Sequence, residues 1–476
     1  MNGHRPNIVL ILVDDLGWVD VSYSGSTFYE TPHIDALATR GLRFSQAYAA
    51  APVCSPSRAA LMSGKYPARV GITNWIGGHT VGSLSDVPYF HGLPINEYSL
   101  AAALRDGGYR TWHVGKWHLG DGQCGPEAHG FEVIIGGGAQ GSPSTYFSPY
   151  SLPPLADGPD GEYLTDRLTD EAVALITEYD GDAPFFLNLW HYGVHTPIQA
   201  PEHLVAHFRQ KAQRLGIDTE AIEEGEAFPA WHVRGVRVRR RTMQSDPTYA
   251  AMVASLDASV GRVMEALRRT GRLDNTLIVF TSDNGGLATA EGSPTCNAPL
   301  AEGKGWMEDG GVRVPLAISW PRKLRPGDTD LLTTTPDLYP TLLAAAQVDG
   351  DSRQHVDGVD ILALVEQSAP DRGPIFWHYP HYSNQGGTPG AAVREGRWKL
   401  IRWFEDGHEA LYDLENDIGE SIDLADEHAE IRIHLAGLLD AWSVDVQALV
   451  PRTNPMWAPE MHRRGFEKPP WNGIPT

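Results

Sequence analysis

The sequence predicts an α/β fold in which helices sandwich a large, mainly parallel (mixed) sheet. Continuous apolar and β-branched segments, of which residues 7–13 (NIVLILV) are the first, are typical of strands buried on both faces of a parallel sheet. Segments with apolar residues at helical spacing alternate with these strands, which is the order that a parallel sheet requires. From about residue 370 the chain changes to short alternating segments, which indicate a separate antiparallel sheet.

The predicted elements follow one another in a regular order. Strands of the large sheet are expected at residues 7–13, 110–114, 185–190, 276–283 and 314–320. Helices are expected at residues 34–40, 97–106, 162–178, about 246–269 and 336–346. Antiparallel strands are expected within residues 391–404 and 408–417, before a helix near residues 429–441. We therefore divide the chain into a large domain at residues 1–369 and a smaller C-terminal α+β subdomain at residues 370–476.

Composition and charge exclude several classes of protein. Of the 476 residues 42% are hydrophobic and 21% are charged, as in a globular protein with a sizeable core. The net charge of −22 argues against a nucleic-acid partner, and the basic segment at residues 233–241 receives no role. The first apolar segment is too short to span a bilayer and lacks a signal-peptide cleavage pattern, so we expect no membrane association. The sequence as written predicts a cytoplasmic location, which would become periplasmic or secreted if a leader had been removed.

Two acidic clusters follow predicted strands. Asp14 and Asp15 follow the strand at residues 7–13, and Asp283 and Asn284 lie at the end of another strand. Ligands of open α/β sheets bind at the carboxyl ends of the strands, so three carboxylates and an amide oxygen would converge if these strands are neighbours. Such an all-oxygen set suits Ca²⁺ or Mg²⁺ better than zinc. Either pair alone is equally well explained as a strand-end cap or turn.

Cys54 begins a predicted helix within the segment VCSPSRAALMSG. A helix start offers unpaired N–H groups and the positive end of the dipole, which favour a nucleophile or a bound anion. The three cysteines of the chain are too few and too scattered for a disulfide framework. Candidate cationic or proton-transferring residues are Arg58, Lys116, His118, His191, His195 and Lys304. Each alone is more often a surface or core-edge residue, but together with a metal ion they describe a pocket for a tetrahedral oxyanion ester.

These segments resemble the formylglycine-dependent type I sulfatases, which are arylsulfatase-like members of the alkaline phosphatase superfamily. The resemblance is carried by CSPSR at residues 54–58 with the following AALMSGKYPARVGIT. It extends through NIVLILVDDLGW, GYRTWHVGKWHLG, HTPIQAP, VFTSDNGG, GGVRVP and REGRWKLI…LYDLENDIGE, over nearly the whole chain. It implies that residues 1–369 form the catalytic domain. It also implies that a formylglycine-generating enzyme oxidises Cys54 to Cα-formylglycine.

The resemblance further implies a role for each candidate residue. Calcium would be held by Asp14, Asp15, Asp283, Asn284 and the modified residue 54. The hydrated aldehyde would attack sulfur and leave a covalent sulfo-enzyme intermediate. Arg58 and Lys116 would orient the hydrate, and His118 would be the base that expels sulfate. His195 and Lys304 would bind sulfate and protonate the leaving oxygen.

The expected substrate is a sulfated carbohydrate or an aryl sulfate, and we favour an exo-acting carbohydrate sulfatase. Candidate substrate residues are aromatic and polar side chains of predicted loops and strand ends, namely Trp75, His91, His191, His378, His381 and Asn384. Loop packing explains these side chains equally well. Two alternatives remain open at this point. The chain could hydrolyse phosphodiesters or phosphonate monoesters like other members of the superfamily, or it could be a non-catalytic glycan-binding protein if Cys54 stays a thiol.

Overall fold

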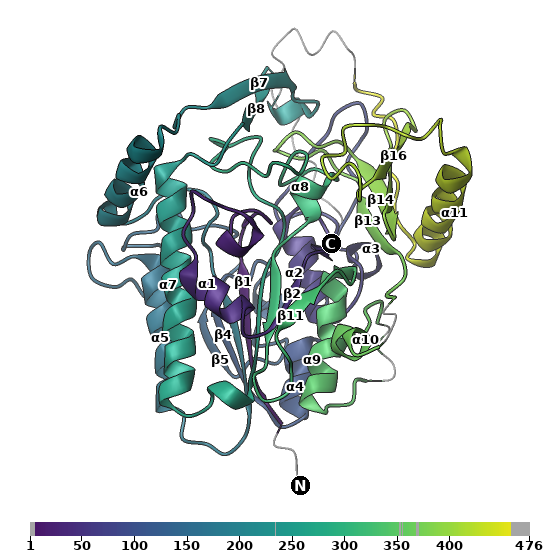
Figure 1. The fold of residues 1–476 in the computed structure, drawn as a ribbon. Coiled ribbons are helices and arrows are strands. Elements are labelled where there is room, and N and C mark those ends of the chain that lie inside the picture. The colour runs from purple at the N-terminus through teal and green to yellow at the C-terminus, as the bar shows by residue number, and fades with distance from the viewer. Residues whose placement is uncertain (1–4, 234, 352–353, 355, 368–370, 458–476) are drawn as a thin grey trace.

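The computed structural model of the chain describes residues 5–457, except 234, 352–353, 355 and 368–370. An eight-stranded sheet forms its centre, with helices on both faces (Figure 1). In spatial order the strands are β11 (Gly327–Thr329), β2 (Leu42–Phe44), β10 (Leu316–Ser319), β9 (Thr276–Ser282), β1 (Asn7–Val13), β6 (Phe185–Trp190), β4 (Arg110–Gly115) and β5 (Val133–Gly136). The strands from β9 to β5 are parallel, whereas β10 is antiparallel to both β9 and β2. The predicted mainly parallel, mixed sheet is therefore confirmed.

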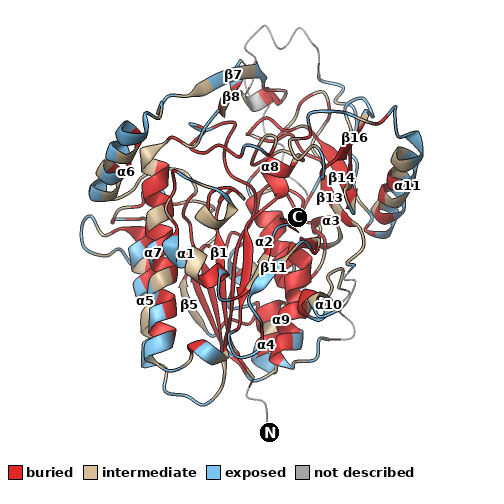
Figure 2. Cartoon of the chain, in the orientation of Figure 1, coloured by how far each residue is buried: buried red, intermediate tan, exposed pale blue. Residues whose placement is uncertain are grey.

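Strand β1 is apolar throughout because both of its faces are covered. Val9, Ile11 and Val13 belong to one core, whereas Ile8 and Leu10 belong to the other. The first core is covered by α1 (Pro32–Ala38), α5 (Leu164–Glu178), α6 (Glu202–Leu215) and α7 (Pro247–Arg269). The second is covered by α2 (Cys54–Ser63), α4 (Leu100–Asp106), α9 (Leu338–Ala346) and α10 (Ile361–Val365). Figure 2 shows the resulting contrast between buried strands and helices with exposed outer faces.

The C-terminal part of the chain forms a second sheet, as predicted. Its four antiparallel strands are β13 (Ile375–Tyr379), β14 (Gly390–Glu395), β15 (Trp398–Trp403) and β16 (Glu409–Asp413). Helix α11 (Ala429–Asp445) packs on one face through Leu435, Leu439 and Trp442. The other face, including Trp377 and Ile401, packs on the segment that leads into α2. The division predicted between residues 369 and 370 falls at residues 368–370, which lie outside the described residues.

The remaining elements are short. They are helices α3 (Pro67–Val70) and α8 (Asp309–Val312), strands β3 (Ala47–Tyr48), β12 (Thr333–Thr334), β7 (Ile222–Ala227) and β8 (Arg237–Arg241), and 3-10 helices at Ser22–Ser24, Gly122–Cys124, Trp231–Val233, Leu273–Asn275 and Thr335–Asp337. Strands β7 and β8 pair as an antiparallel ribbon, so most of the basic segment at residues 233–241 is a strand. Within the described residues, every helix is too short or too polar to cross a bilayer.

Candidate active site

The polar residues predicted at strand ends gather at one edge of the large sheet. Strands β1 and β9 are direct neighbours, with Val13 opposite Ser282, so Asp14 and Asp283 leave the sheet side by side. The backbone after β6 joins them, because the N–H of Val194 donates to the carbonyl of Asp14 at 2.8 Å. The sheet topology therefore brings the ends of β1, β6 and β9 to one place, where ligands of open α/β sheets bind.

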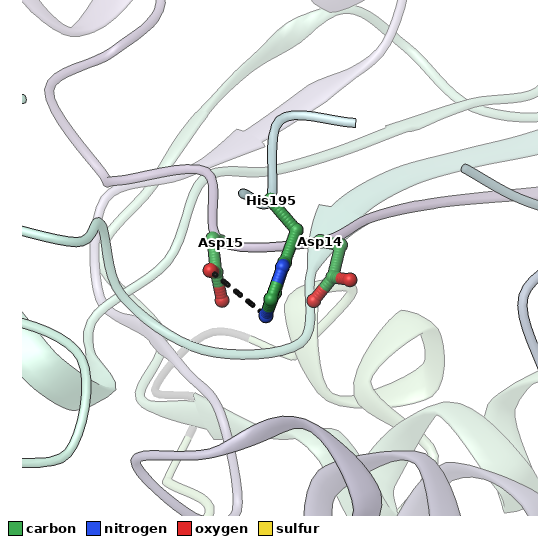
Figure 3. Close-up of side chains that lie close together, drawn as sticks. All are labelled: Asp14, Asp15 and His195. Carbon is green, nitrogen blue, oxygen red and sulfur yellow. Dashed lines mark ion pairs between the residues drawn. The ribbon is translucent and has the colours of Figure 1, made fainter. Parts of the chain in front are cut away.

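Four buried side chains form the acidic part of this site. The exposed fractions of Asp14, Asp15, Asp283 and Asn284 are all 1% or less. Asn284 Nδ2 donates to Asp15 Oδ1 at 2.8 Å, and the Asp15 N–H donates to Asp283 Oδ1 at 3.3 Å. One ligand atom each of Asp14, Asp283 and Cys54 lies within 4.8 Å of the other two. Asp14, Asp15 and His195 form a second such group, which Figure 3 shows converging on a common space.

Three buried cations balance the three carboxylates. Lys116 Nζ lies 2.5 Å from Asp14 Oδ2, and Lys304 Nζ lies 2.8 Å from Asp15 Oδ2. The Arg58 guanidinium contacts Asp283 Oδ2 at 2.7 Å. Because charges removed from water need partners, this alternation offsets part of the cost of burying six ionisable groups together.

The electrostatic balance differs between neighbouring carboxyls. Burial raises the pKa of Asp14, and the carboxylates of Asp283 and Asp15 add to this effect against the opposing charge of Lys116. Burial also acts on Asp15, but Lys304 and His195 outweigh it and hold the pKa of Asp15 below its usual value. A divalent cation bound beside Asp14 would therefore favour the ionised form of all three carboxyl groups, those of Asp14, Asp15 and Asp283.

The donor set fits a hard divalent cation such as Ca²⁺. Asp14 Oδ1 and Asn284 Oδ1 are buried oxygens without a hydrogen-bond donor among the described residues. A buried acceptor left unpaired costs about 1–3 kcal/mol, so structures rarely keep one without a reason. Carboxylate and amide oxygens are the ligands that Ca²⁺ and Mg²⁺ prefer. The residues that would hold the ion are Asp14, Asp15, Asp283 and Asn284, beside residue 54.

Cys54 is the first residue of α2 and is 3% exposed. The preceding residue, Val53, has no side chain that could cap the helix, so the first N–H groups of α2 have no side-chain cap. Burial raises the pKa of the Cys54 thiol, and this disfavours the thiolate that a cysteine nucleophile needs. The unmodified thiol is therefore poorly activated.

Two neutral histidines flank residue 54 and the acidic cluster. His118 Nδ1 lies 3.2 Å from Cys54 Sγ, and His195 Nε2 lies 3.7 Å from Asp15 Oδ2. Burial lowers the pKa of His118 well below its usual value and lowers that of His195 to about 3. Each imidazole is thus neutral at pH 7. Gly141 permits the close approach of its loop to His118, because a Cβ there would lie 2.4 Å from the imidazole.

A cavity of about 280 Å³ opens over this cluster. Its wall consists of Val53, Cys54, Trp75, His118, Gly141, Ser142, His195, Thr196, Glu291, Lys304, Asn384 and Gln385. The structure thus brings four predicted catalytic side chains and two predicted loop residues, Trp75 and Asn384, to one cavity. Ser142, Thr196, Glu291 and Gln385 were missed by the sequence analysis. Ser142, Glu291 and Gln385 lie in loops without periodicity or a distinctive motif, whereas Thr196 lies in the HTPIQAP motif beside His195 and could have been found there.

The other histidines proposed for the substrate lie away from this cavity. His91 stacks on Tyr89 with ring centroids 4.7 Å apart, and His191 is buried with Nε2 3.0 Å from Ser259 Oγ. His378 Nε2 lies 2.9 Å from the carbonyl oxygen of Leu449. The structure thus places these three side chains in packing contacts rather than on the cavity wall.

His381 supports the loop that carries Trp75. Its Nδ1 lies 2.5 Å from Asp86 Oδ1, and its Nε2 lies 2.8 Å from Thr73 Oγ1. The hydroxyl of Tyr89 donates to the carbonyl of Trp75 at 2.9 Å. These contacts hold residues 73–89, the loop that carries Trp75, against the C-terminal part of the chain. His381 therefore influences the cavity by fixing the position of Trp75.

The C-terminal sheet also supports the segment that carries Lys304. Lys399 of β15 is fully buried, and its Nζ lies 2.8 Å from both Asp309 Oδ1 and Glu420 Oε1. Asp309 begins α8, five residues after Lys304. The backbone N–H of Lys304 itself donates to the carbonyl of Gly286 at 3.0 Å, next to the acidic cluster. Both parts of the chain therefore hold the cavity in shape.

Comparisons with known proteins cover nearly the whole chain. The sulfatase family matches residues 6–348, and the C-terminal region of N-sulphoglucosamine sulphohydrolase matches residues 303–442. A sulfatase of Formosa agariphila is 30% identical over 92% of this chain and 89% of its own. The N-acetylgalactosamine-6-sulfatase of Mus musculus is 31% identical over 84% of this chain and 72% of its own.

Solved structures show the same architecture. A crystal structure described as Ps i-CgsB in complex with k-i-k-neocarrahexaose is 32% identical to this chain. It superimposes with a TM-score of 0.75 and covers 95% of both chains. The similarity therefore includes the large sheet, the edge at which the polar cluster lies, and the C-terminal sheet.

Proposed function

Because the chain belongs to the sulfatase family and is a sulfuric ester hydrolase, we propose that it is an exo-acting carbohydrate sulfatase that uses Cα-formylglycine at position 54. The observation that carries the proposal is the position of Cys54 at the start of α2, in the wall of a cavity that also contains His118, His195 and Lys304. A formylglycine-generating enzyme would act on the chain before it folds, since Cys54 is buried afterwards.

The cavity supports a single terminal sugar as the substrate unit. Its volume of about 280 Å³ lies near the lower end of the range for ligand pockets, about 300–1,000 Å³. Trp75 offers an aromatic face, and Ser142, Asn384 and Gln385 offer hydrogen-bonding groups. Aromatic stacking with a few polar contacts is suited to a sugar ring. The mouse and Ps i-CgsB relatives, named for a sulfated sugar and bound to neocarrahexaose respectively, support the same substrate class.

The residues around position 54 have different roles in the proposed reaction. The formylglycine hydrate would supply the nucleophilic oxygen, and Ca²⁺ at the acidic cluster would supply positive charge to the reacting oxygens. Arg58 and Lys116 fix the acidic cluster by their contacts with Asp283 and Asp14. Neutral His118, 3.2 Å from the side chain of residue 54, accepts a proton from that side chain.

Lys304 is suited to the leaving-group side of the reaction. Burial opposes its charged form, but the Asp15 carboxylate and the other nearby anions raise the pKa of Lys304 well above its usual value. Its ammonium group is therefore protonated at neutral pH and lines the cavity. It can neutralise sulfate and the negative charge that develops on the leaving oxygen.

Replacing Lys304 by alanine is expected to affect poor leaving groups most. A sugar leaving oxygen develops more negative charge that the ammonium group must neutralise, so kcat/KM for a sugar sulfate should fall about 100- to 1,000-fold. An activated aryl sulfate leaves without that help and should lose about tenfold or less. Steady-state rates for both substrates measure the difference. The exposed Lys323 serves as the matched control, since Lys323→Ala should change neither rate. Equal losses for both substrates would remove Lys304 from the proton-donor role.

The proposed function is tested on protein produced together with a formylglycine-generating enzyme. The mass of the peptide spanning residue 54 should show the aldehyde. This protein should then release sulfate from terminal monosulfated sugars, with a kcat/KM at least about tenfold above that for matched phosphodiesters. Preference for the phosphodiester would identify a different hydrolase, and a thiol at residue 54 under these conditions would refute the formylglycine mechanism.

A further inference from the structure

We infer that the unit from which sulfate is removed is uncharged and rich in hydroxyl groups, and that Glu291 excludes a second anionic group beside the scissile sulfate. This inference rests on the proposed function and deepens it, because it defines the class of sugar that the cavity accepts. It follows from the charges on the cavity wall and from the contacts of the residues around it.

The cavity wall offers one cation for sulfate and none beyond it. Among the described residues that line it, Lys304 is the single lysine or arginine, and its Nζ already contacts Asp15 at 2.8 Å. The two histidines of the wall, His118 and His195, contact residue 54 and Asp15. The rest of the wall consists of Trp75 and uncharged polar or apolar groups, apart from Glu291. A second sulfate or carboxylate on the same sugar would enter without a cation to balance the loss of its water.

Glu291 places a negative charge on the same wall. Its Oε1 accepts a hydrogen bond from Gln385 Nε2 at 2.6 Å. Gln385 is itself held by Ser383 Oγ, which donates to its Oε1 at 2.6 Å, and by Trp306 Nε1, which donates to its carbonyl at 2.8 Å. The glutamate is therefore positioned by a buried support, although its own side chain is exposed toward the cavity mouth. A carboxylate held there accepts hydrogen bonds from sugar hydroxyls and repels anions.

Arg240 and Arg241 of the nearby ribbon β7–β8 do not add positive charge to the cavity wall. Arg240 of β8 contacts Glu226 at 2.8 Å and Glu302 at 2.7 Å, and Arg241 donates to the carbonyl of Ser293 at 2.6 Å. Arg240 also lies over the Trp306 ring, 5.6 Å from its centroid. These two guanidinium groups are used within the protein and are absent from the cavity wall. Arg240 and Arg241 therefore stabilise the ribbon and its neighbours, and neither adds a cation to the cavity wall.

Two aryl sulfates that differ by one charge test the inference. The probes are 3-carbamoylphenyl sulfate and 3-carboxyphenyl sulfate, which are similar in size and differ in the negative charge of the carboxylate. Binding is measured by calorimetry on Cys54→Ala protein, which cannot turn them over, and kcat/KM is measured on protein with the aldehyde at residue 54. We expect the uncharged probe to be favoured about tenfold or more in both measurements, as repulsion between two charges in a partly solvated cavity produces.

The variant Glu291→Gln isolates the source of the preference. Glutamine keeps the size of the side chain and can still accept the hydrogen bond from Gln385, so it removes the charge alone. The preference should fall to about threefold or less in this variant, since most of the repulsion has gone. The exposed Glu427 before α11 provides the control, because Glu427→Gln should leave the preference unchanged.

The outcomes separate this inference from the proposed function. Equal affinity for both probes, or an undiminished preference in Glu291→Gln, would overturn the inference. If both probes bind in the expected ratio but protein with a verified aldehyde at residue 54 releases no sulfate, the proposed function fails while the charge selection stands. If the protein releases sulfate but does not distinguish the two probes, the proposed function stands and the inference about Glu291 fails.

Discussion

Cys54→Ala protein is expected to hydrolyse sulfate esters at least about 10⁵-fold more slowly than protein with the aldehyde at residue 54, in line with the loss of other catalytic nucleophiles. The physical reason is that alanine offers no atom that formylglycine-generating chemistry can oxidise. Lys304 in the cavity wall would remain and still bind the sulfate group. The loss should therefore appear in kcat, with a much smaller change in the affinity for substrate. Single-turnover and steady-state rates measure the two contributions.

The other two cysteines provide controls for this substitution. Cys296 is buried and Cys124 is half-buried, and neither lines the cavity. Cys296→Ala and Cys124→Ala should keep the rate within about threefold, because small changes in packing at a distance leave the site in place. If Cys54→Ala retained more than about one hundredth of the rate, residue 54 would not be the nucleophile.

Removal of divalent cations is expected to lower the rate by about 10⁴-fold and to lower the melting temperature at the same time. Three buried carboxylates and the unpaired oxygens of Asp14 and Asn284 would lose their common partner on removal of an ion bound there. An ion at a concentration of about 100 times its Kd contributes about 2.7 kcal/mol to the free energy of unfolding, so the thermal shift is large enough to measure. Readdition of Ca²⁺ and Mg²⁺ in separate samples identifies the ion that restores both quantities.

A substitution in the acidic cluster distinguishes this site from adventitious binding. Asp14→Asn removes one carboxylate, and its melting temperature should no longer respond to the ion. Asp328 is exposed on the edge strand β11, where it pairs with Arg43, so Asp328→Asn should retain the full response. A thermal shift of the same size in both variants would place the ion elsewhere.

Local sequence patterns predicted the secondary structure well because each pattern reports the environment of its own segment. Residues 7–13 are apolar at every position after Asn7, and β1 is indeed buried on both faces. The antiparallel strands after residue 370 were recognised by their alternation and turns. The segment at residues 314–320 was read as one more strand of a mainly parallel sheet, but its direction could not be read from its composition. The structure shows that β10 within it is antiparallel to β9.

The sequence by itself determined five of the eight strands of the large sheet, the motif around Cys54 and the pairs of acidic residues at strand ends, because these features depend on residues close together in the chain. It did not predict the short strands β2, β5 and β11 or the helix α6. Only the tertiary structure decided which side chains meet. Asp14 pairs with Lys116 across 102 positions, and Glu291 is held by Gln385 across 94. The tertiary structure also places His191, His378 and His381 in contact with neighbouring residues away from the cavity wall. It pairs Arg240 of the basic segment with Glu226. The physical reason is that charge and hydrogen-bond partners are selected by distance in space, which the topology of the sheet sets and no local pattern contains.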